Sequence, residues 1–415
     1  MEYGCIGEHL KHSFSKEIHA LLADYDYEIK EIERENLPRF MEDREFRAIN
    51  VTIPYKRAVI PYLYEISDTA KRIGAVNTVV NRGGKLYGYN TDFSGMRALI
   101  LKNGIELKGK KVLILGSGGT SSTACAVAEN LGASKVFRVS RSEKSGYITY
   151  GQMYESHTDA EIIINTTPVG MYPNISGAAA DISKFSRLSG VVDAVYNPLR
   201  PEIVLKARAA GIKATGGLYM LVSQAAFAYE KFVGKVIDSC VIDKVYRKIM
   251  AQKENIVLIG MPSCGKSTIG EKIADSFSRE FIDTDSVIVE KEGKPVTQIF
   301  SESGEEYFRK LEKEVIAEIS AKSGCVIATG GGAVLNTDNI FKLRQNGRIY
   351  FIDRPIDKLI TTPDRPLSSD REALERRYSE RYGKYCSAAD VKFTPSDDVD
   401  YNVKVILEDF SGDRI

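Results

Sequence analysis

Cysteine is scarce in this sequence and never forms the C-x-x-C pair that is typical of zinc and redox centres. The six cysteines lie far apart, at Cys5, Cys125, Cys240, Cys264, Cys325 and Cys386. The four histidines, His12 among them, are equally scattered. We therefore expect neither a disulfide framework nor a zinc site, and the composition fits a reducing, cytoplasmic compartment.

Neither sign of charge is in excess, and long apolar runs are missing. The chain has 57 lysines and arginines against 56 acidic residues, so no global field favours nucleic acid or an anionic membrane surface. No run of about 18 apolar residues occurs, and the N-terminal MEYGCIGEHLKHS lacks the basic flank and apolar core of an export signal. We expect small-molecule substrates, with no nucleic-acid or membrane partner, and the oligomeric state stays open.

What is present is an ordinary globular composition over a long chain. Apolar residues make up 43% of the sequence and charged residues 27%, which is typical of a folded protein. The 415 residues exceed the roughly 250 to 300 at which single cores stop growing. We therefore expect two or three domains.

Short apolar runs alternate with helix-length amphipathic segments along the whole chain, which is typical of βαβ units around a parallel sheet. The expected strands are 111–115, 135–139, 161–165, 191–194, 256–259, 326–328 and 349–352. Between Gln224 and Lys253 the sequence becomes helical and charged, and the strand IVLIG follows. We place a domain boundary near Lys253.

The most specific single motif is GMPSCGKS at residues 260–267, a complete G-x-x-x-x-G-K-S between a strand and a helix. In such a loop, backbone N–H groups and the helix N-terminus receive nucleotide phosphates, the lysine neutralises their oxygens and the last hydroxyl binds magnesium. The expected ATP-binding residues are Ser263, Cys264, Gly265, Lys266, Ser267 and Thr268, with Ser267 also a Mg²⁺ ligand. A chance glycine-rich turn is the competing interpretation.

Two carboxylates, Asp283 and Asp285, end the run EFIDTD. On a strand, side chains two positions apart point the same way. One of the two carboxylates could then hold the water of a metal ion, while the other meets a substrate hydroxyl. A solvated acidic turn is the alternative.

Further motifs follow these in order: Phe308-Arg309-x-x-Glu312, Gly330-Gly331-Gly332, Arg365-Pro366-Leu367 and Arg381-Tyr382-x-x-Tyr385. From about Lys253 to the C-terminus, the set resembles shikimate kinases. The resemblance implies a nucleoside-kinase-like P-loop fold, a parallel sheet with helices on both faces, that transfers the γ-phosphoryl group of ATP to the 3-hydroxyl of shikimate.

The resemblance also implies roles for single residues. Asp285 would be the catalytic base, which leaves Asp283 as the metal ligand. The substrate would be bound by Asp285, Arg309, Gly331 and Arg381. Arg365 would act on the transferring phosphate from a lid, although the lid stretch 360–365 is shorter than is usual in the family. Guanidinium groups suit a carboxylate substrate, but a surface salt bridge is the commoner role of an arginine.

In the first half, Gly116, Gly118 and Gly119 stand directly after an apolar strand and before a helix, as a dinucleotide-binding loop requires. The next strand ends in Ser140-Arg141-Ser142-Glu143-Lys144, where an NAD site would place an acidic residue. Arginine there suits a ribose 2'-phosphate and predicts NADP(H). The expected coenzyme residues in this region are Gly116, Ser117, Gly118, Gly119, Thr120, Ser140, Arg141, Ser142 and Lys144.

A second ordered set of motifs spans nearly all of residues 1–250. It comprises HSFS (12–15), NVTIPYK (50–56), GAVNT (74–78), NTD (90–92), NTTPVGM (165–171), DAVYNP (193–198) and GLYMLVSQ (217–224). This set resembles shikimate dehydrogenases. The resemblance implies a two-lobed dehydrogenase over 1–252, with a substrate lobe (1–95 plus 225–252) and a Rossmann-like NADP-binding lobe (96–224), followed by the kinase at 253–415.

From the same resemblance, Lys56 and Asp92 would be the catalytic pair beside the hydroxyl that is oxidised or the ketone that is reduced. A lysine beside a carboxylate can supply the proton and steady the developing charge. The implied substrate-binding residues are Ser13, Ser15, Thr52, Lys56, Asn77, Asp92, Tyr196 and Gln224, and Ala194 and Gly217 would border the coenzyme. Surface charges, and helix capping by the two serines, are the alternatives.

Together the two resemblances predict a bifunctional α/β enzyme with NADP(H), ATP and Mg²⁺ as cofactors. It would reduce 3-dehydroshikimate to shikimate and then phosphorylate shikimate, toward chorismate and aromatic amino acids. Three alternatives stay open: a sensing or scaffold protein built from degenerate copies of these folds, a dehydrogenase that prefers quinate and NAD, and a chain in which one half alone is active.

Overall fold

The computed structural model describes residues 1–8, 10, 14–359 and 371–412. The chain forms two compact units, residues 1–249 and 250–415. The division falls within α9 (Ser239–Lys253), and Glu254 alone separates this helix from β13 (Asn255–Ile259). The boundary expected near Lys253 lies at the end of the same helix.

The first unit begins with a mixed six-stranded sheet in the order β2-β1-β3-β5-β6-β4. Its strands are β1 (Tyr3–Gly7), β2 (Tyr27–Glu31), β3 (Ala48–Val51), β4 (Glu65–Ile66), β5 (Thr78–Arg82) and β6 (Lys85–Tyr89). The helices in this part are α1 (Ser15–Leu22), α2 (Leu37–Asp43) and α3 (Asp68–Ile73). Strand β5 runs antiparallel to β3 and β6, and fully buried side chains such as Ile6, Met41 and Ile49 form the core.

The same unit continues with a parallel six-stranded sheet in the order β12-β11-β10-β7-β8-β9. Its strands are β7 (Lys111–Leu115), β8 (Lys135–Ser140), β9 (Ile148–Thr149), β10 (Ile162–Asn165), β11 (Gly190–Asp193) and β12 (Lys213–Thr215). The helices are α5 (Gly119–Asn130), α6 (Tyr150–Ser156) and α7 (Glu202–Ala209). The four strands expected here from apolar runs are all present. Strands β7, β10 and β11 are almost entirely buried, as expected for apolar runs in a sheet that is covered on both faces.

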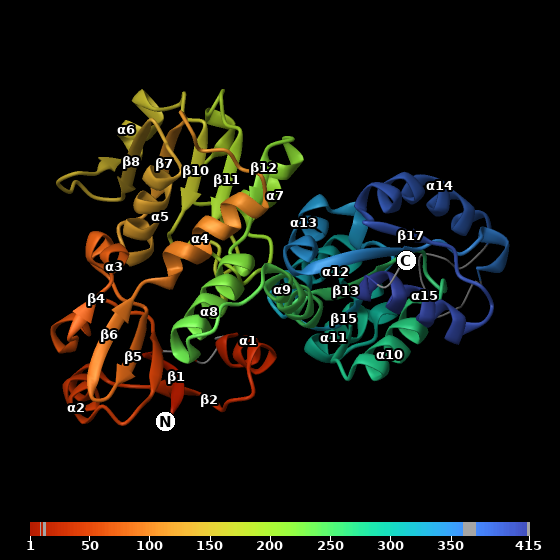
Figure 1. The fold of residues 1–415 in the computed structure, drawn as a ribbon. Helices are drawn as coiled ribbons and strands as arrows, with labels where there is room; N and C mark the ends of the chain where they lie inside the picture. The colour runs from red at the N-terminus through yellow and green to blue at the C-terminus, as the bar shows by residue number, and fades with distance from the viewer. Residues whose placement is uncertain (9, 11–13, 360–370, 413–415) are drawn as a thin grey trace. The chain divides into compact units, whose positions relative to one another are not determined.

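Two long helices lie between these sheets, α4 (Thr91–Lys102) and α8 (Leu218–Val233), and they pack closely against each other (Figure 1). Gly95 of α4 marks the close approach. A Cβ atom placed there would come within 2.7 Å of the Met220 carbonyl oxygen and 3.0 Å of the Gln224 backbone nitrogen. The absence of a side chain at Gly95 therefore sets the spacing of the helices that carry Asp92 and Gln224.

Gly95→Ala is expected to destabilise the chain by about 1 to 3 kcal/mol, because the clash is with backbone and the helices must separate. Gly151→Ala is the control: it lies in α6, and the nearest atom to its Cβ would be Thr149 Oγ1 at 3.7 Å. Alanine at that control position should be neutral or stabilising, by up to about 1 kcal/mol. Denaturant unfolding of both full-length variants would measure the difference, and equal stabilities would contradict the close-packing interpretation.

The second unit is a parallel five-stranded sheet in the order β14-β15-β13-β16-β17 with helices on both faces (Figure 1). After β13 its strands are β14 (Phe281–Asp283), β15 (Val326–Ala328), β16 (Gly347–Ile352) and β17 (Val391–Phe393). Its helices are α10 (Lys266–Phe277), α11 (Thr284–Glu292), α12 (Val296–Ile319), α13 (Thr337–Asn346), α14 (Arg371–Ala388) and α15 (Val399–Ser411). The α/β prediction is confirmed in both units. Within the described ranges, none of the helices has the length and apolar character needed to cross a lipid bilayer.

Candidate active sites

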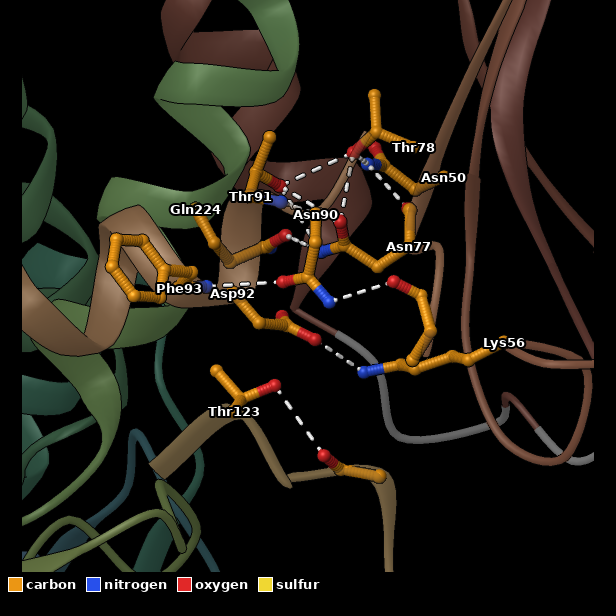
Figure 2. A network of polar contacts seen from close by, with 12 residues as sticks. Asn50, Lys56, Asn77, Thr78, Asn90, Thr91, Asp92, Phe93, Thr123 and Gln224 are labelled. Carbon is orange, nitrogen blue, oxygen red and sulfur yellow. Dashed lines mark hydrogen bonds and ion pairs between the residues drawn. The ribbon is translucent and has the colours of Figure 1, made fainter. Parts of the chain in front are cut away.

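The predicted catalytic pair of the first unit is in direct contact. Lys56 Nζ lies 2.6 Å from Asp92 Oδ2 (Figure 2), and the two side chains are only 18% and 10% exposed. Lys56 follows β3, and its carbonyl oxygen accepts a hydrogen bond from Val76 N at 2.8 Å. Asp92 lies in the first turn of α4, which Asn90 caps by accepting from Phe93 N. Two residues 36 positions apart thus form one ion pair that is shielded from water, where charge interactions are stronger.

Two amide side chains predicted to bind substrate lie in the same polar network. Asn77 Nδ2 donates to Thr91 Oγ1 at 3.0 Å and to Gln224 Oε1 at 3.4 Å (Figure 2). Asn77 Oδ1 in turn accepts from Thr91 N at 2.7 Å. The network therefore joins the start of α4, the loop before β5 and the middle of α8 beside the Lys56–Asp92 pair.

Asn50 and Thr78 also belong to this network, although sequence reasoning gave them no role. Asn50 Oδ1 accepts from Tyr27 OH at 2.7 Å, and Asn50 Nδ2 donates to Thr78 Oγ1 at 3.2 Å. Thr78 Oγ1 also donates to Asn77 Oδ1 at 3.1 Å. Both residues stand inside the quoted NVTIPYK and GAVNT motifs, which was the signal available. Their buried position behind Asn77 depends on the pairing of β1, β2, β3 and β5.

The remaining predicted substrate residues are partly placed. Ser13 and His12 lie outside the described residues. Ser15 is buried and is the first residue of α1, whose cap position is occupied by Phe14. The helix-capping alternative is therefore wrong for Ser15. Thr52 directly follows β3. The Tyr196 ring meets the Phe14 ring edge-on at 5.2 Å, so the parallel-sheet lobe contacts the start of α1.

The glycine-rich loop after β7 forms an open cradle at the N-terminus of α5. A Cβ atom on Gly118 or Gly119 would meet no protein atom within 4 Å. Ser117 and Gly118 are exposed, and Thr120 lies in the first turn of the helix. A helix N-terminus with open space before it suits phosphate groups. These residues therefore fit the dinucleotide predicted for them. Gly116 is instead packed against the next loop, since a Cβ there would lie 2.6 Å from Thr166 Oγ1.

The segment after β8 is basic and exposed. Ser140 ends the strand, and Arg141, Ser142 and Lys144 are exposed to solvent. In the described part of the chain neither Arg141 nor Lys144 forms an ion pair. Cations without carboxylate partners at this strand end fit a ribose 2'-phosphate.

Ala194 and Gly217 are brought together at the carboxyl edge of the parallel sheet. Gly217 N donates to Val195 O at 2.8 Å. A Cβ on Gly217 would lie 2.2 Å from the Ala194 carbonyl oxygen. The start of α8 is therefore docked on the loop after β11, at the edge where ligands bind in open parallel sheets.

Asp193, whose role sequence reasoning missed, holds this edge together. Asp193 Oδ1 accepts from Asn165 Nδ2 at 3.0 Å and from Val195 N at 2.9 Å. Asn165 Oδ1 accepts from Thr167 N and Thr167 Oγ1. Burial raises the pKa of the fully enclosed Asp193 carboxyl to about 7, although these two hydrogen bonds favour its ionised form. The pair ties the loop after β10 to the loop after β11.

Asp193→Asn is expected to flatten the pH dependence of stability. The folded chain keeps a proton on Asp193 up to about pH 7, whereas an unfolded carboxyl loses it near 3.8. In that window the folded state binds more protons, so the free energy of unfolding falls as the pH rises. Calorimetric unfolding of the full chain at about pH 5 and about pH 8 should show a smaller difference for the variant than for the wild-type chain. Equal differences would contradict this account.

In the second unit, the G-x-x-x-x-G-K-S loop connects β13 to α10. Gly265 has a φ of 99°, a left-handed conformation that glycine adopts at little cost, and α10 begins at the next residue. Lys266 Nζ donates to the carbonyl oxygens of Gly260 and Met261 at 3.0 and 2.9 Å. Cys264 is buried beneath the loop, whereas Ser267 and Thr268 are exposed at the helix start. Ser267 and Thr268 are therefore presented at the N-terminus of α10, whereas the Lys266 ammonium group is buried against carbonyl oxygens of the loop itself.

The two predicted metal-binding residues are in contact: Ser267 Oγ donates to Asp283 Oδ2 at 2.8 Å. A hydroxyl and a carboxylate suit Mg²⁺, which keeps several waters and substrate phosphates in its coordination shell. In the described ranges no group of three or more His, Cys, Asp or Glu side chains is placed to hold a metal. Ser267 and Asp283 therefore fit a metal whose other ligands come from solvent and nucleotide.

The strand interpretation of Asp285 is wrong. Strand β14 ends at Asp283, and α11 begins at Thr284. Asp283 Oδ1 caps this helix by accepting from Asp285 N at 3.0 Å, so Asp285 lies in a first helical turn and the alternation of strand side chains does not apply. A Cβ on Gly330 would lie 2.5 Å from Asp285 Oδ1. Asp285 thus faces the glycine loop after β15, while Asp283 faces Ser267.

The predicted substrate residues of this unit converge on the Gly330–Gly332 loop. Arg381 Nη1 donates to Gly331 O at 3.0 Å, and a Cβ on Gly332 would collide with the Arg309 guanidinium. Arg309 pairs with Glu305 at 2.9 Å and with Glu312 at 3.0 Å. Arg365 lies outside the described residues, as does the lid stretch 360–365.

Glu312 stands at the centre of this cluster without having been assigned a role from the sequence. Its side chain is 1% exposed. Burial raises the pKa of Glu312 to about 7; Arg309 and Arg381 oppose the rise, and the Asp285 carboxylate adds to it. The motif Phe308-Arg309-x-x-Glu312 was the available signal, since positions three apart share a helix face.

Both ends of the chain match known families. Residues 5–79 match the shikimate dehydrogenase substrate binding domain, and residues 262–410 match shikimate kinase. The shikimate dehydrogenase (NADP(+)) of Clostridium beijerinckii is 36% identical over 245 residues, which cover 55% of this chain and 90% of that protein. The corresponding protein of Halothermothrix orenii is 37% identical over 260 residues, which cover 56% and 90%.

Solved structures resemble the same part of the chain. A chorismate mutase/shikimate 5-dehydrogenase fusion protein from Clostridium acetobutylicum has a TM-score of 0.56 at 35% identity, over 60% of this chain and 96% of that chain. Shikimate 5-dehydrogenase from Thermus thermophilus, in complex with NADP(H) and shikimate, has a TM-score of 0.55 at 30% identity, over 60% and 99%.

The fold and the two sites define a two-domain enzyme that joins a dinucleotide-dependent oxidoreductase to a P-loop phosphotransferase. The chain belongs to the shikimate dehydrogenase family through its first unit, and its second unit carries a shikimate kinase domain. Both family predictions made from the sequence are confirmed.

Proposed function

We propose that the chain catalyses two consecutive reactions: NADPH-dependent reduction of 3-dehydroshikimate to shikimate, and ATP-dependent phosphorylation of shikimate to shikimate 3-phosphate. These steps lead toward chorismate and the aromatic amino acids. The observation that carries the first activity is the shielded Lys56–Asp92 pair, 2.6 Å apart, beside the Asn77 and Gln224 amides. The second rests on the shikimate kinase match together with the Ser267–Asp283 contact.

In the first reaction, Lys56 holds a proton at Nζ and delivers it to the carbonyl oxygen that is being reduced. Asp92 holds the ammonium group in position, which places positive charge where negative charge develops. The Asn77 and Gln224 amides, with Ser15, Thr52 and Tyr196, supply hydrogen bonds to a ligand with several hydroxyls and a carboxylate. NADPH, when bound, supplies the hydride.

The coenzyme is held by residues 116–120 and by the basic segment 140–144. The open space at Gly118 and Gly119 receives the diphosphate, and Arg141 and Lys144 favour a 2'-phosphorylated ribose over NAD. A quinate dehydrogenase that prefers NAD would have no use for these cations.

In the second reaction, Asp285 accepts the proton of the attacking hydroxyl, and Arg309 and Arg381 grip the carboxylate of shikimate. Lys266 neutralises phosphate oxygens of ATP, which supplies the phosphoryl group. We assign Mg²⁺ to Ser267 and Asp283, where it would neutralise charge on the phosphates. Arg365 is proposed to stabilise the transferring group.

We also propose a cytoplasmic location. The six cysteines are scattered along the sequence without a C-x-x-C pair, which suits a reducing compartment.

One coupled assay tests both activities. The full chain is mixed with 3-dehydroshikimate, NADPH, ATP and magnesium, while NADPH absorbance and ADP release are followed together. We expect both signals, with ADP release dependent on NADPH until shikimate is added directly. If NADPH is oxidised but no ADP is released, even with added shikimate, the proposal is restricted to the first unit. If neither NADPH oxidation nor ADP release is observed, a sensing or scaffold role is favoured.

A further inference from the structure

Three cationic side chains gather at the end of β8, and only two of them follow from the dinucleotide pattern. Arg138 is the unexpected one, since it lies within the strand. Its guanidinium carbon is 4.2 Å from the centre of the Tyr147 ring, and Lys144 Nζ is 4.8 Å from the same centre. Tyr147 directly follows the exposed segment 141–146. Because its ring contacts both Arg138 and Lys144, the basic segment lies close to Arg138.

Arg138 also reaches the phosphate-binding helix. Arg138 Nη2 donates to Ser122 Oγ at 3.3 Å, and Ser122 is the fourth residue of α5. Arg138 and Ser140 share the face of β8 that meets α5, because side chains two apart on a strand point the same way. The guanidinium therefore lies between the first turn of α5 and the segment that follows Ser140.

The charge of Arg138 is poorly neutralised by the protein itself. In the described ranges Arg138 forms no ion pair, and its buried Nε has no hydrogen-bond partner. Arg138 and Tyr147 also line a cavity of about 470 Å³, but its lining includes Glu129 and neither Ser140 nor residues 116–120, so this cavity is separate from the predicted phosphate-binding loop. A half-buried guanidinium with spare donors is costly, and the contact with an aromatic ring offsets only part of that cost. An anion bound close to Ser140 would neutralise part of the Arg138 charge.

We propose that Arg138, held by Tyr147 and Ser122, is a coenzyme-specificity residue that adds positive charge behind the ribose 2'-phosphate of NADP(H). The inference rests on the proposed dehydrogenase function. Arg141 and Lys144 approach the phosphate from the exposed segment, whereas Arg138 acts from the strand. Because NAD lacks the 2'-phosphate, the contribution of Arg138 is specific to NADP.

Arg138→Met tests the proposal through coenzyme binding, independently of turnover. Isothermal titration of the full chain with NADP⁺ and with NAD⁺ gives the ratio of the two Kd values. The variant should lower the preference for NADP⁺ about tenfold or more, the usual effect of losing a charge-assisted contact. Lys135→Met, which removes one exposed cation from the start of the same strand, should leave the ratio unchanged.

Tyr147→Leu provides a second test, since it removes the ring that holds the guanidinium but keeps the charge, and Tyr147 is only half-buried. It should lower the preference in the same direction by a smaller factor. The proposal is overturned if Arg138→Met weakens both coenzymes equally, which indicates a structural role, or if neither variant changes the ratio. A wild-type chain that binds neither coenzyme would instead refute the dehydrogenase function itself.

Discussion

Lys56→Ala is expected to slow the turnover of the dehydrogenase reaction by about a thousandfold, within the range found for loss of a general acid or base. The variant loses the proton donor and leaves Asp92, only 10% exposed, without its cation. A carboxylate stranded near the reacting oxygen repels the negative charge that develops there. The measurement is steady-state NADPH oxidation at saturating 3-dehydroshikimate.

Two controls separate this chemical effect from misfolding. Lys71→Ala removes an exposed lysine of α3 in the same unit, whose contact with Asp68 is long at 3.8 Å, and should leave reduction unchanged. Phosphorylation of added shikimate by the Lys56→Ala preparation should proceed at the wild-type rate. Reduction within a few-fold of wild type in the Lys56 variant would exclude Lys56 as the proton donor.

The fold was predictable from the sequence because parallel strands buried on both faces are short apolar runs bounded by turns. The runs at 111–115 and 256–259 each lead into a glycine-rich loop, so the strand, the loop and the following helix were predictable together. The pairing order of the strands, which puts β13 between β15 and β16, depends on contacts between distant segments and has no comparable local signal.

The sites were predictable to a different depth. Motif positions pointed to Lys56, Asp92 and Asp285 as candidates, but they did not indicate the residues that hold these side chains in place. Asp193 and Glu312 are buried carboxyls that bind polar partners. Because most acidic residues are exposed to solvent, the sequence alone offered no reason to expect them in the interior. The error over Asp285 has a different cause. An aspartate at position 283 suits the end of a strand as well as the N-cap of a helix, so the sequence did not show that a helix begins at Thr284.

Glycine positions show how closely backbone spacing is adjusted to these sites. Gly217 allows the start of α8 to dock on Ala194, and Gly332 leaves room for the Arg309 guanidinium. A side chain at either position would displace a group that is proposed to contact ligand. The requirement is steric, which explains why glycine recurs at the edges of both parallel sheets.

Asp285→Asn is expected to slow the turnover of shikimate phosphorylation by about a thousandfold, again within the range for loss of a general base. Asparagine has nearly the same shape and retains the backbone N–H that donates to Asp283, so α11 should start at the same residue. The amide cannot take up the proton of the attacking hydroxyl. ADP release with added shikimate measures the effect, and the KM for ATP should change little, because Asp285 faces the Gly330 loop rather than the phosphate-binding loop.

Glu290→Gln is the matched control, because it makes the same carboxylate-to-amide change at an exposed position of the same helix and should leave phosphorylation intact. NADPH-dependent reduction by the Asp285→Asn preparation should equal that of the wild-type chain. Together with Lys56→Ala, this gives a reciprocal pair of variants in which each reaction fails while the other continues. If Asp285→Asn phosphorylates shikimate at a rate close to wild type, another residue must accept the proton. Glu312 would then be the next residue to replace, because its pKa of about 7 suits proton transfer near neutral pH.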